Sequence, residues 1–288
     1  MDKYLETQKR LIERALGSYW SRFGNSVIIE FPGFSIKGKL AKAMYYAVFA
    51  KGKRFRPLLC LATAQALGCS PRKVLPFACA VEFVHTFTLI HDDLPAMDNA
   101  DFRRGRPSCH KVFGEAIAIL AGDALSTLAF QIIAHYPEAS KELANALLKV
   151  VEGQVLDLGI SGKRLSLSSL KRIHRLKTGA LLEACVRGSA LICGASSSQL
   201  KALTNYAQHL GLAFQIVDDL LDVTATQEEL GKPAKADFQK GFPYLVGVDK
   251  ARKMAEEERQ KALAALKKFG KEADLLRSLL ELAVRRSK

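Results

Sequence analysis

Apolar residues recur at helical spacing along most of this chain, and almost no stretch alternates between apolar and polar residues. A chain with this pattern buries its apolar side chains by packing helix against helix. The predicted fold is therefore all-α. We expect a single domain covering residues 1–288, a bundle of about ten or more helices with the most apolar helices at its centre.

Capping residues and prolines predict where the helices begin and end. Ser70 followed by Pro71 is a favourable helix start, and Pro95 predicts that this helix ends at about Leu94. The run Val27–Phe31 is the only β-like stretch, and because one strand cannot form a sheet, we expect no sheet. The predicted helices cover residues 2–20, 38–49, 53–67, 71–94, 108–134, 138–158, 167–194, 197–223, 244–268 and 271–286.

The composition supports a sizeable core and an anionic partner. The chain has 288 residues, of which 49% are hydrophobic, and a formal net charge of +14. That charge suits nucleic acid, anionic lipid or a polyphosphate substrate. Nucleic-acid binding would need a basic stripe with aromatic or groove-reading side chains, whereas the basic residues are spread along a chain with one Trp. We therefore expect no nucleic-acid partner.

Cysteine spacing and the apolar stretches bear on the compartment. The six cysteines include no Cys-x-x-Cys pair, which predicts buried reduced thiols rather than a zinc site. The N-terminal residues are charged throughout, so no secretory signal is indicated. Asp123 interrupts the apolar stretch 116–134, and Glu183 and Arg187 interrupt the stretch 181–195, so neither is expected to span a membrane. These patterns predict a cytoplasmic protein without a transmembrane segment.

Two segments place carboxylates at the C-terminal ends of predicted long helices. The first contains Asp92, Asp93 and Asp98, and the second contains Asp218, Asp219 and Asp222. Such crowding beside the negative end of a helix dipole is unfavourable without a counterion. Mg²⁺ takes oxygen ligands and commonly bridges carboxylates to phosphate oxygens. A single Asp-Asp pair could be a solvated helix end, but two clusters on apolar helices predict a magnesium–phosphate site.

Basic residues accompany these clusters. Arg103 and Arg104 follow the first cluster, and their guanidinium groups match phosphate oxygens bidentately. The segment Lys-Gly-Lys-Arg-Phe-Arg-Pro at 51–57 opens a predicted helix whose N-terminus favours an anion. The segment Lys-Thr-Gly at 177–179 interrupts an apolar helix, and there phosphate binding and a helix kink at the glycine remain alternatives.

The segments that carry these residues resemble the trans-prenyl diphosphate synthase family, most closely its bacterial farnesyl diphosphate synthase branch. The similarity extends over roughly residues 40–285. It is carried by GKRFRP at 52–57, VEFVHTFTLIHDDLPAMDNADFRRGRPSCH at 81–110, GEAIAILAGDAL at 114–125, GQVLDL at 153–158, KTGALLEACVRGSAL at 177–191 and GLAFQIVDDLLDV at 211–223. The resemblance implies an isoprenoid synthase fold, in which helices surround a central apolar cavity.

The resemblance also implies roles for individual residues. Contacts to isopentenyl diphosphate would come from Lys53, Arg56, His85 and Arg104, with Gly52 letting the backbone approach the anion, and contacts to the allylic diphosphate from Arg103, Lys177, Thr178 and Gln215. Magnesium ligands would be Asp92, Asp98, Asp218 and Asp222, with Asp93 and Asp219 also in the catalytic set. Gln154 and Asp157 would line the pocket, and Lys232 and Lys240 would add cations for the leaving diphosphate.

The implied reaction is a head-to-tail condensation of isopentenyl diphosphate with dimethylallyl or geranyl diphosphate. The resemblance implies Mg²⁺ as cofactor, three ions with substrate bound, and a homodimer as the assembly. Arginine and lysine side chains would stabilise the departing diphosphate, and an apolar pocket would exclude water from the allylic cation. No protein nucleophile is needed, and none is evident in the sequence.

Two other functions remain open. Class I terpene cyclases share the first aspartate cluster, but their second motif is usually rich in Asn, Ser or Thr, and Glu, and they need no isopentenyl site. Here the second cluster is Asp-Asp-x-x-Asp at 218–222, which favours chain elongation. A non-catalytic prenyltransferase subunit is expected to lose aspartates, and both clusters are intact.

The segment after the second cluster departs from the family pattern. Relatives commonly show an aspartate, a short spacer and Gly-Lys-x-Thr, whereas here Asp237-Phe-Gln-Lys240-Gly241-Phe-Pro-Tyr244 is shorter and lacks the threonine. Either Lys240 or Lys232 could reach the leaving diphosphate. We expect this loop to be mobile and to become ordered when substrate binds.

Product length is expected to depend on residues one turn before Asp92, which would form the end of the pocket for the growing chain. Phe87 is bulky enough to stop that chain, and Thr88 is not. The four residues between Asp93 and Asp98 add a spacing that is typical of bacterial short-chain enzymes in this family. Both features predict the C15 product farnesyl diphosphate. The C20 product geranylgeranyl diphosphate is the alternative, and Phe87 could also be an ordinary core residue.

Overall fold

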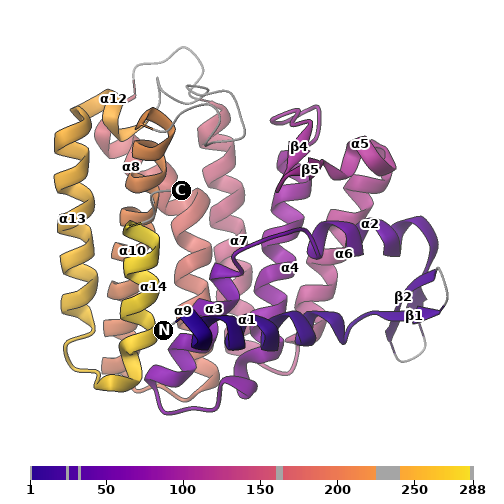
Figure 1. The fold of residues 1–288 in the computed structure, drawn as a ribbon, viewed down its shortest axis with the longest axis horizontal. Coiled ribbons are helices and arrows are strands. Elements are labelled where there is room, and N and C mark those ends of the chain that lie inside the picture. The colour runs from indigo at the N-terminus through magenta and orange to yellow at the C-terminus, as the bar shows by residue number, and fades with distance from the viewer. Residues whose placement is uncertain (1, 24–25, 32–33, 160–164, 225–240, 286–288) are drawn as a thin grey trace. The chain divides into compact units, whose positions relative to one another are not determined.

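The computed structural model describes residues 2–23, 26–31, 34–159, 165–224 and 241–285, and it is mostly helical, as predicted (Figure 1). The chain forms two compact units. The first consists of residues 1–61 and 75–137, and the second of residues 62–74 and 138–288. A single domain covering 1–288 stays a prediction.

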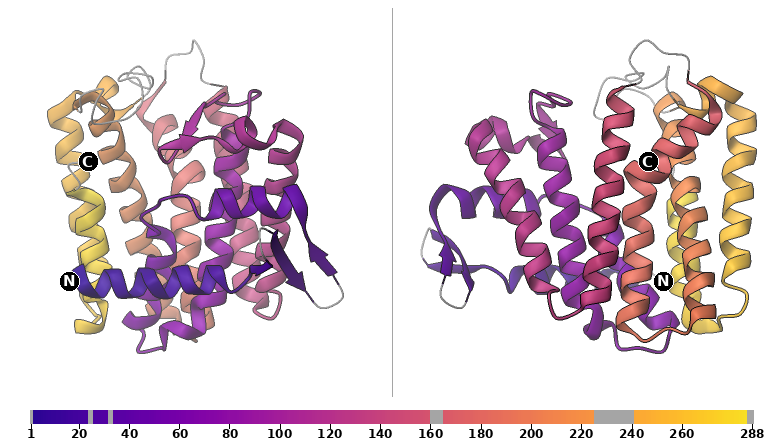
Figure 2. Two further views of the ribbon diagram at one scale, coloured as in Figure 1. Left: turned by 45° about the vertical axis from the view of Figure 1, so that its right-hand side comes forward. Right: turned by 180° about the vertical axis from the view of Figure 1, so that it is seen from behind.

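The first unit combines helices with two small antiparallel sheets. Its elements are α1 (Asp2–Gly17), β1 (Ser21–Phe23), β2 (Ser26–Phe31), β3 (Phe34–Ile36), α2 (Gly38–Val48), the start of α3 (Phe55–Ala66), α4 (Leu75–Asp92), β4 (Phe102–Arg103), β5 (Arg106–Pro107), α5 (Cys109–Phe113) and α6 (Glu115–Ile132). Strand β2 lies between β1 and β3, and it packs against α2 (Figure 2).

Helix α4 is the centre of the first unit. Every residue from Phe77 to Val84 is buried, because this part of the helix is apolar around its circumference except at Glu82. The ring of Phe83 packs edge-on against Trp20, with 5.5 Å between the ring centroids. Near the end of α4, His91 fills the space beside Gly122 of α6, where a Cβ atom would overlap the imidazole. The helix that carries the first aspartate cluster is therefore held rigidly.

The second unit is built around a long helix. Its elements are the end of α3, a 3₁₀ turn (Pro71–Val74), α7 (Pro137–Leu158), α8 (Leu167–His174), a π-helical segment (Arg175–Gly179), α9 (Ala180–Ile192), α10 (Ser197–Thr224), α12 (Phe242–Val246), α13 (Val248–Ala265), a 3₁₀ turn (Lys271–Ala273) and α14 (Asp274–Val284). Helix α10 packs against α9, α13 and α14 (Figure 1).

Buried polar contacts join α10 to its neighbours. The Tyr206 hydroxyl, on a fully buried side chain, donates to the carbonyl of Leu276 in α14 at 2.7 Å. Nδ1 of His209 lies 2.6 Å from Oε2 of Glu258 in α13. Toward its C-terminal end, α10 contributes Ile216 and other apolar residues to a cluster with α12 and α13. The helix that carries the second aspartate cluster is thus fixed on several sides.

The expectation that no sheet would form was wrong. The run that includes Val27–Phe31 is strand β2, and it pairs with β1 and β3 to form a three-stranded antiparallel sheet. A second pair, β4 and β5, forms a two-stranded hairpin. The flanking strands β1 and β3 have three residues each, which is too short to show an alternating pattern in the sequence.

Three predicted helices are interrupted. The predicted helix 108–134 is divided into α5 and α6 at Gly114, whose φ of 88° is incompatible with a continuing right-handed helix. The predicted helix 244–268 begins at Phe242 and is divided at Gly247, with φ of 83°. The predicted helix 167–194 contains the π-helical segment, and α4 ends at Asp92, two residues before the predicted end.

Two helices, Pro71–Asp92 and Glu115–Ile132, are long and apolar enough to cross a membrane when length and composition alone are considered. The interior of the protein buries 61% of the most apolar window of the first and 33% of that of the second. A buried core helix has the same length and composition as a membrane span, so these two properties do not distinguish the alternatives. Cysteines form no disulfide in the described structure, and four of the six are buried.

Candidate active site

The first aspartate cluster lies where α4 ends and the chain turns back. The amide of Asp98 donates to the carbonyl of Asp92 at 2.8 Å, and the amide of Ala100 donates to the carbonyl of Asp93 at 3.1 Å. These bonds satisfy carbonyl groups that the helix end leaves without intrahelical partners. Asp92 is half-buried and Asp98 is exposed. The turn therefore holds the two predicted magnesium ligands of this cluster in one short loop.

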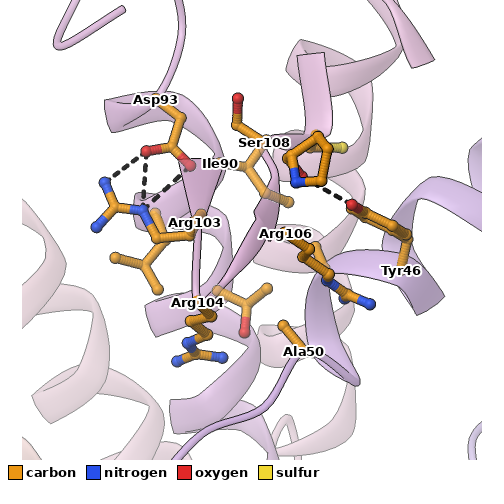
Figure 3. Close-up of a pocket in the computed structure, with 13 residues that line it drawn as sticks. Tyr46, Ala50, Ile90, Asp93, Arg103, Arg104, Arg106 and Ser108 are labelled. Carbon is orange, nitrogen blue, oxygen red and sulfur yellow. Dashed lines mark hydrogen bonds and ion pairs between the residues drawn. The ribbon is translucent and has the colours of Figure 1, made fainter. Parts of the chain in front are cut away.

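Asp93 has a different environment from the other two aspartates. It is 2% exposed, and Nε and Nη2 of Arg103 donate to its Oδ1 at 2.9 and 2.5 Å. Burial raises the pKa of Asp93, and the hydrogen bonds and charge of Arg103 oppose that shift. Figure 3 shows the guanidinium of Arg103 turned toward this carboxylate. Asp93 thus holds the side chain that was predicted to contact the allylic diphosphate.

The adjacent Arg103 and Arg104 lie in a tight hairpin, Arg103 at the end of a strand and Arg104 in the turn. Arg103 pairs with Arg106 across β4 and β5, and the two residues between them form the turn. Arg104 has φ of 53° and Gly105 has φ of 78°, which corresponds to a type I′ turn. Glycine adopts this conformation readily, but an arginine does so at a cost in backbone strain. The hairpin directs Arg104 away from Asp93, as Figure 3 shows.

A pocket lies beside this hairpin (Figure 3). Its lining includes three of the predicted site residues, Asp93, Arg103 and Arg104, and several that the sequence did not indicate: Tyr46, Thr86, Arg106 and Ser108. The guanidinium carbon of Arg106 lies 3.8 Å from the centroid of the Tyr46 ring, a cation–π contact. The only sequence signal for this lining is the third arginine in the run Arg-Arg-Gly-Arg.

Predicted contacts to isopentenyl diphosphate form two pairs in the first unit. Nη1 of Arg56 lies 3.1 Å from Nε2 of His85. A Cβ atom on Gly52 would lie 3.4 Å from the guanidinium carbon of Arg104, so the glycine allows this arginine to pack against the backbone. Lys53 is exposed. The structure therefore brings four of the five predicted residues into pairwise contact.

The histidine of this group is held neutral by its surroundings. Burial lowers the pKa of His85 well below its ordinary value, and the charges of Arg56 and Arg104 lower it further. A neutral imidazole has one acceptor nitrogen, and Arg56 has only donors. His85 therefore accepts a hydrogen bond from Arg56 through Nε2 and carries its proton on Nδ1.

In the second unit, Lys177 and Thr178 lie on the π-helical segment. A kink at Gly179 is not observed, because this glycine has an ordinary helical conformation and the local change is a wider helical turn. Phosphate binding by this segment stays a prediction. Nζ of Lys177 lies 2.6 Å from Oδ2 of Asp157 in α7. Gly153 of α7 lies so close that a Cβ atom there would overlap the backbone of Lys177.

The second aspartate cluster is linked to this segment by hydrogen bonds. The Thr178 hydroxyl donates to Oε1 of Gln215 at 2.7 Å, and Nε2 of Gln215 donates to Oδ2 of Asp218 at 3.1 Å. Gln215 therefore orients Asp218 relative to the segment that carries Lys177. Asp222 is half-buried one turn further along α10.

Asp219 is oriented toward α12 instead. Its Oδ2 accepts a hydrogen bond from the amide of Phe242 at 2.9 Å and lies 3.3 Å from Nε2 of His174. The ring of His174 stacks on that of Phe242. Asp219 thus caps the first turn of α12, a role that its position in the Asp-Asp pair did not indicate.

Within the described residues, no group of three or more His, Cys, Asp or Glu side chains is arranged to hold a metal ion. Mg²⁺ commonly binds through one or two carboxylates together with substrate phosphates and waters. The carboxylates of Asp92, Asp98, Asp218 and Asp222 supply ligands of the right chemistry for that mode. The predicted cations Lys232 and Lys240 lie outside the described residues, as do residues 237–240 of the loop that was expected to be mobile. The rest of that segment is described, and it forms the start of α12 at Phe242.

Phe87 lies on α4 before the first cluster, and it is half-buried. Its ring packs edge-on against the imidazole of His91, with 5.0 Å between the centroids. The adjacent Thr88 turns its hydroxyl back to the carbonyl of His85 at 2.8 Å. Phe87 is therefore supported by its own helix, and its predicted role in product length stays a prediction.

Comparisons with known proteins agree with the resemblance in the sequence. The family model for polyprenyl synthetase matches residues 37–283. The chain is 48% identical over 249 residues to a farnesyl diphosphate synthase of Geobacillus stearothermophilus, covering 82% of this chain and 80% of that one. It is 39% identical over 301 residues to a geranylgeranyl diphosphate synthase of Cyanophora paradoxa, covering 99% and 96%.

A solved structure shows the same fold. An FPP/GFPP synthase from Zymomonas mobilis superposes with a TM-score of 0.81 at 35% sequence identity, covering 98% of each chain. The match of the family model extends over both aspartate clusters and the basic segments beside them. This chain therefore belongs to the polyprenyl synthetase family.

Proposed function

We propose that this chain is a prenyltransferase that condenses isopentenyl diphosphate with dimethylallyl or geranyl diphosphate, and that its main product is farnesyl diphosphate. The observation that carries the proposal is the Arg56–His85 pair together with Arg104 in the first unit. These cations accompany an aspartate cluster that has its own arginine, Arg103. A condensation of two diphosphates needs two sets of phosphate contacts, whereas cyclisation of one diphosphate needs only one.

Mg²⁺ fits the residues present, and three ions with substrate bound are part of the proposal. Asp92 and Asp98 would hold metal from the first unit, and Asp218 and Asp222 would hold metal from the second. The bound metal would neutralise the diphosphate and make it a better leaving group. Because no complete metal cage exists within the described residues, substrate phosphates would complete the coordination.

The chain's own side chains would then hold both diphosphates. Arg103 and Lys177 each hydrogen-bond to a carboxylate, Asp93 and Asp157 respectively, which orients the cation for phosphate oxygens. These cations stabilise the negative charge that develops on the departing diphosphate. Thr178, the neighbour of Lys177 in the chain, is linked through Gln215 to Asp218, so a predicted phosphate contact and a proposed metal ligand share one hydrogen-bonded group.

The alternatives are less well supported. The intact Asp218, Asp219 and Asp222 argue against a terpene cyclase and against a non-catalytic subunit. Relatives that are named geranylgeranyl diphosphate synthases match the chain as well, so a C20 product is the second candidate. The higher identity to a farnesyl diphosphate synthase and the bulk of Phe87 favour C15.

We further propose a cytoplasmic homodimer. Helix α7 exposes an apolar stripe at helical spacing, formed by Leu148, Val151, Val155 and Leu158, whose exposed fractions lie between 48% and 71%. An exposed apolar stripe of this kind is typical of a protein–protein interface. A second copy of the chain is the proposed partner, and sedimentation of the purified protein would measure its mass.

One assay tests the central proposal. Purified protein is incubated with Mg²⁺, dimethylallyl diphosphate and labelled isopentenyl diphosphate, and the products are separated after dephosphorylation. We expect labelled farnesol as the main product and no product when EDTA replaces Mg²⁺. Labelled geranylgeraniol as the main product would support the C20 alternative. Cyclic hydrocarbon without incorporated label, or no product at all, would contradict the proposal.

A further inference from the structure

Arg54 is a buried arginine whose hydrogen bonds are almost completely satisfied. It is 3% exposed, and its Nη1 donates to Oε1 of Glu82 at 2.7 Å. Its Nε donates to Oε1 of Glu13 and its Nη2 to the carbonyl of Val48, both at 2.7 Å. A guanidinium held in this way has little remaining capacity for a substrate. Arg54 is therefore a structural member of the basic segment 51–57 and not one of its phosphate contacts.

Glu82 also faces a second arginine. The same Oε1 atom lies 3.8 Å from Nη2 of Arg104, which is too long for a hydrogen bond but close for two opposite charges. Glu82 is 1% exposed and the Arg104 side chain is 18% exposed. Water therefore screens this attraction much less than it would at the surface. One buried carboxylate thus interacts with two arginines, Arg54 and Arg104.

The surroundings of Arg104 make this carboxylate important. Burial lowers the pKa of Arg104, and the positive charges of Arg54, Arg56 and Arg103 lower it further, whereas Glu82 raises it. Nη1 of Arg104 is buried and has no hydrogen-bond partner within the described part of the chain. A Cβ atom at position 52 would lie 3.4 Å from this guanidinium, so the glycine leaves room for it on another side. A buried donor without a partner is unfavourable, and a phosphate oxygen would satisfy it.

We propose that Glu82 is a positioning residue that holds the Arg104 guanidinium in place for the diphosphate of isopentenyl diphosphate. This inference rests on the proposed function. Glu82 does not touch the substrate. It acts through Arg104, and Arg54 keeps the Glu82 carboxylate oriented because it binds the same oxygen from another side.

The test compares two glutamates that share Arg54. Glu82→Gln removes the charge that faces Arg104, whereas Glu13→Gln removes the other partner of Arg54 and leaves Glu82 intact. We expect Glu82→Gln to raise the KM for isopentenyl diphosphate about tenfold, which is typical for weakening one charge-assisted contact. The KM for dimethylallyl diphosphate and kcat should change by less than about twofold. Glu13→Gln should leave all three constants within about twofold of wild type.

A double-mutant cycle separates positioning from a general loss of structure. In an Arg104→Ala background, Glu82→Gln should raise the KM for isopentenyl diphosphate no further, because the residue through which it acts is gone. An equal additional increase in that background would overturn the proposal. So would equal increases in the KM of both substrates, or equal effects of Glu82→Gln and Glu13→Gln.

A third variant tests the proposal if the Glu82→Gln protein does not fold. Glu82→Asp keeps the charge but withdraws it by one methylene group, and it should raise the KM for isopentenyl diphosphate selectively and by a smaller factor. An unchanged KM in a folded Glu82→Asp protein would overturn the proposal. Wild-type protein without condensation activity would instead refute the proposed function, so the two failures are distinguishable.

Discussion

Nη1 of Arg56 lies 3.1 Å from Nε2 of His85, and in this pair the arginine donates and the imidazole accepts. The orientation requires His85 to be neutral, which its lowered pKa ensures. Arg56 is consequently fixed by a side chain that brings no negative charge to compete with a phosphate. The pair combines a fully charged cation with a neutral support, which suits a site for an anionic substrate.

Replacing Arg56 by Ala should weaken the binding of isopentenyl diphosphate more than the binding of the allylic substrate. Loss of a charge-assisted contact typically costs about 1.5–3 kcal/mol, or roughly tenfold to a hundredfold in affinity. The KM for dimethylallyl diphosphate should change much less. Steady-state kinetics with each substrate varied in turn would measure both constants, and Arg72→Ala, at an exposed position, is the matched control. An equal increase in the KM for both substrates would show that Arg56 is assigned to the wrong site.

The lowered pKa of His85 predicts a pH dependence of stability. In the unfolded chain His85 binds a proton below about pH 6.5, whereas in the folded protein it stays neutral to a much lower pH. The unfolded state therefore binds more protons, and stability falls as the pH drops below about 6.5, by up to about 1.4 kcal/mol per pH unit. Chemical denaturation between pH 7 and pH 5 should show a smaller slope for His85→Gln than for wild type. His135→Gln, at an exposed position, is the matched control.

Asp92→Ala and Asp218→Ala should each abolish turnover and leave the fold intact. Each variant loses a proposed metal ligand, while removal of one negative charge from a crowded cluster relieves repulsion. The free energy of unfolding without metal should therefore stay within about 1 kcal/mol of wild type, since in Asp218→Ala the lost hydrogen bond from Gln215 opposes the relief of repulsion. Activity assays and thermal denaturation would measure both effects, with the exposed Asp249→Ala as control. More than a few per cent of activity in both variants would contradict the two-cluster metal site.

Gly153→Ala tests the packing beneath the π-helical segment. A methyl group at 153 would overlap the backbone of Lys177, so α7 or the segment must shift. Overpacking of this kind costs about 1–3 kcal/mol and should lower the melting temperature by about 2–4 °C per kcal/mol. The KM for the allylic diphosphate should rise, since Lys177 moves. Gly159→Ala, whose added methyl group would lie at an ordinary 3.4 Å from its nearest neighbour, should behave as wild type in both measurements.

Phe87→Ala should lengthen the main product by at least one C5 unit at little cost in total turnover. The phenyl ring is the bulky group one turn before Asp92, and removing it would open space for a longer chain. Product analysis by chromatography would measure this. Thr88→Ala removes little volume at the neighbouring position and should leave the product distribution unchanged. An unchanged product in Phe87→Ala would place the limit on chain length elsewhere.

Much of the fold could be predicted from periodicity because helices α4, α7 and α10 are long and strongly patterned. Interruptions were harder to predict. Gly114 and Gly247 divide helices through positive φ angles, but the sequence does not distinguish such a glycine from a tolerated helical one such as Gly153. The short sheet of β1–β3 forms because neighbouring segments pair with one another. The strand propensity of a single segment does not predict that pairing.

The sequence predicted which residue types form the site, but it did not predict which partner each of them binds. The sequence indicated all the aspartates, yet only the structure shows that Asp93 binds Arg103 and Asp219 caps α12. Neighbours in a helical sequence point in different directions, and which partner each one meets is decided by tertiary packing. Glu82 carried one signal, a charge within an otherwise apolar helix, and its two arginine partners lie far from it in sequence.

The left-handed conformation of Arg104 has a consequence for the directed evolution of this protein. Asn or Gly at position 104 would relax the backbone of the hairpin turn, so a library selected for heat resistance alone should drift toward those residues. A library selected for condensation at moderate temperature should keep arginine there. Position 104 is thus a place where the two selections should diverge, and deep sequencing of both populations would reveal it.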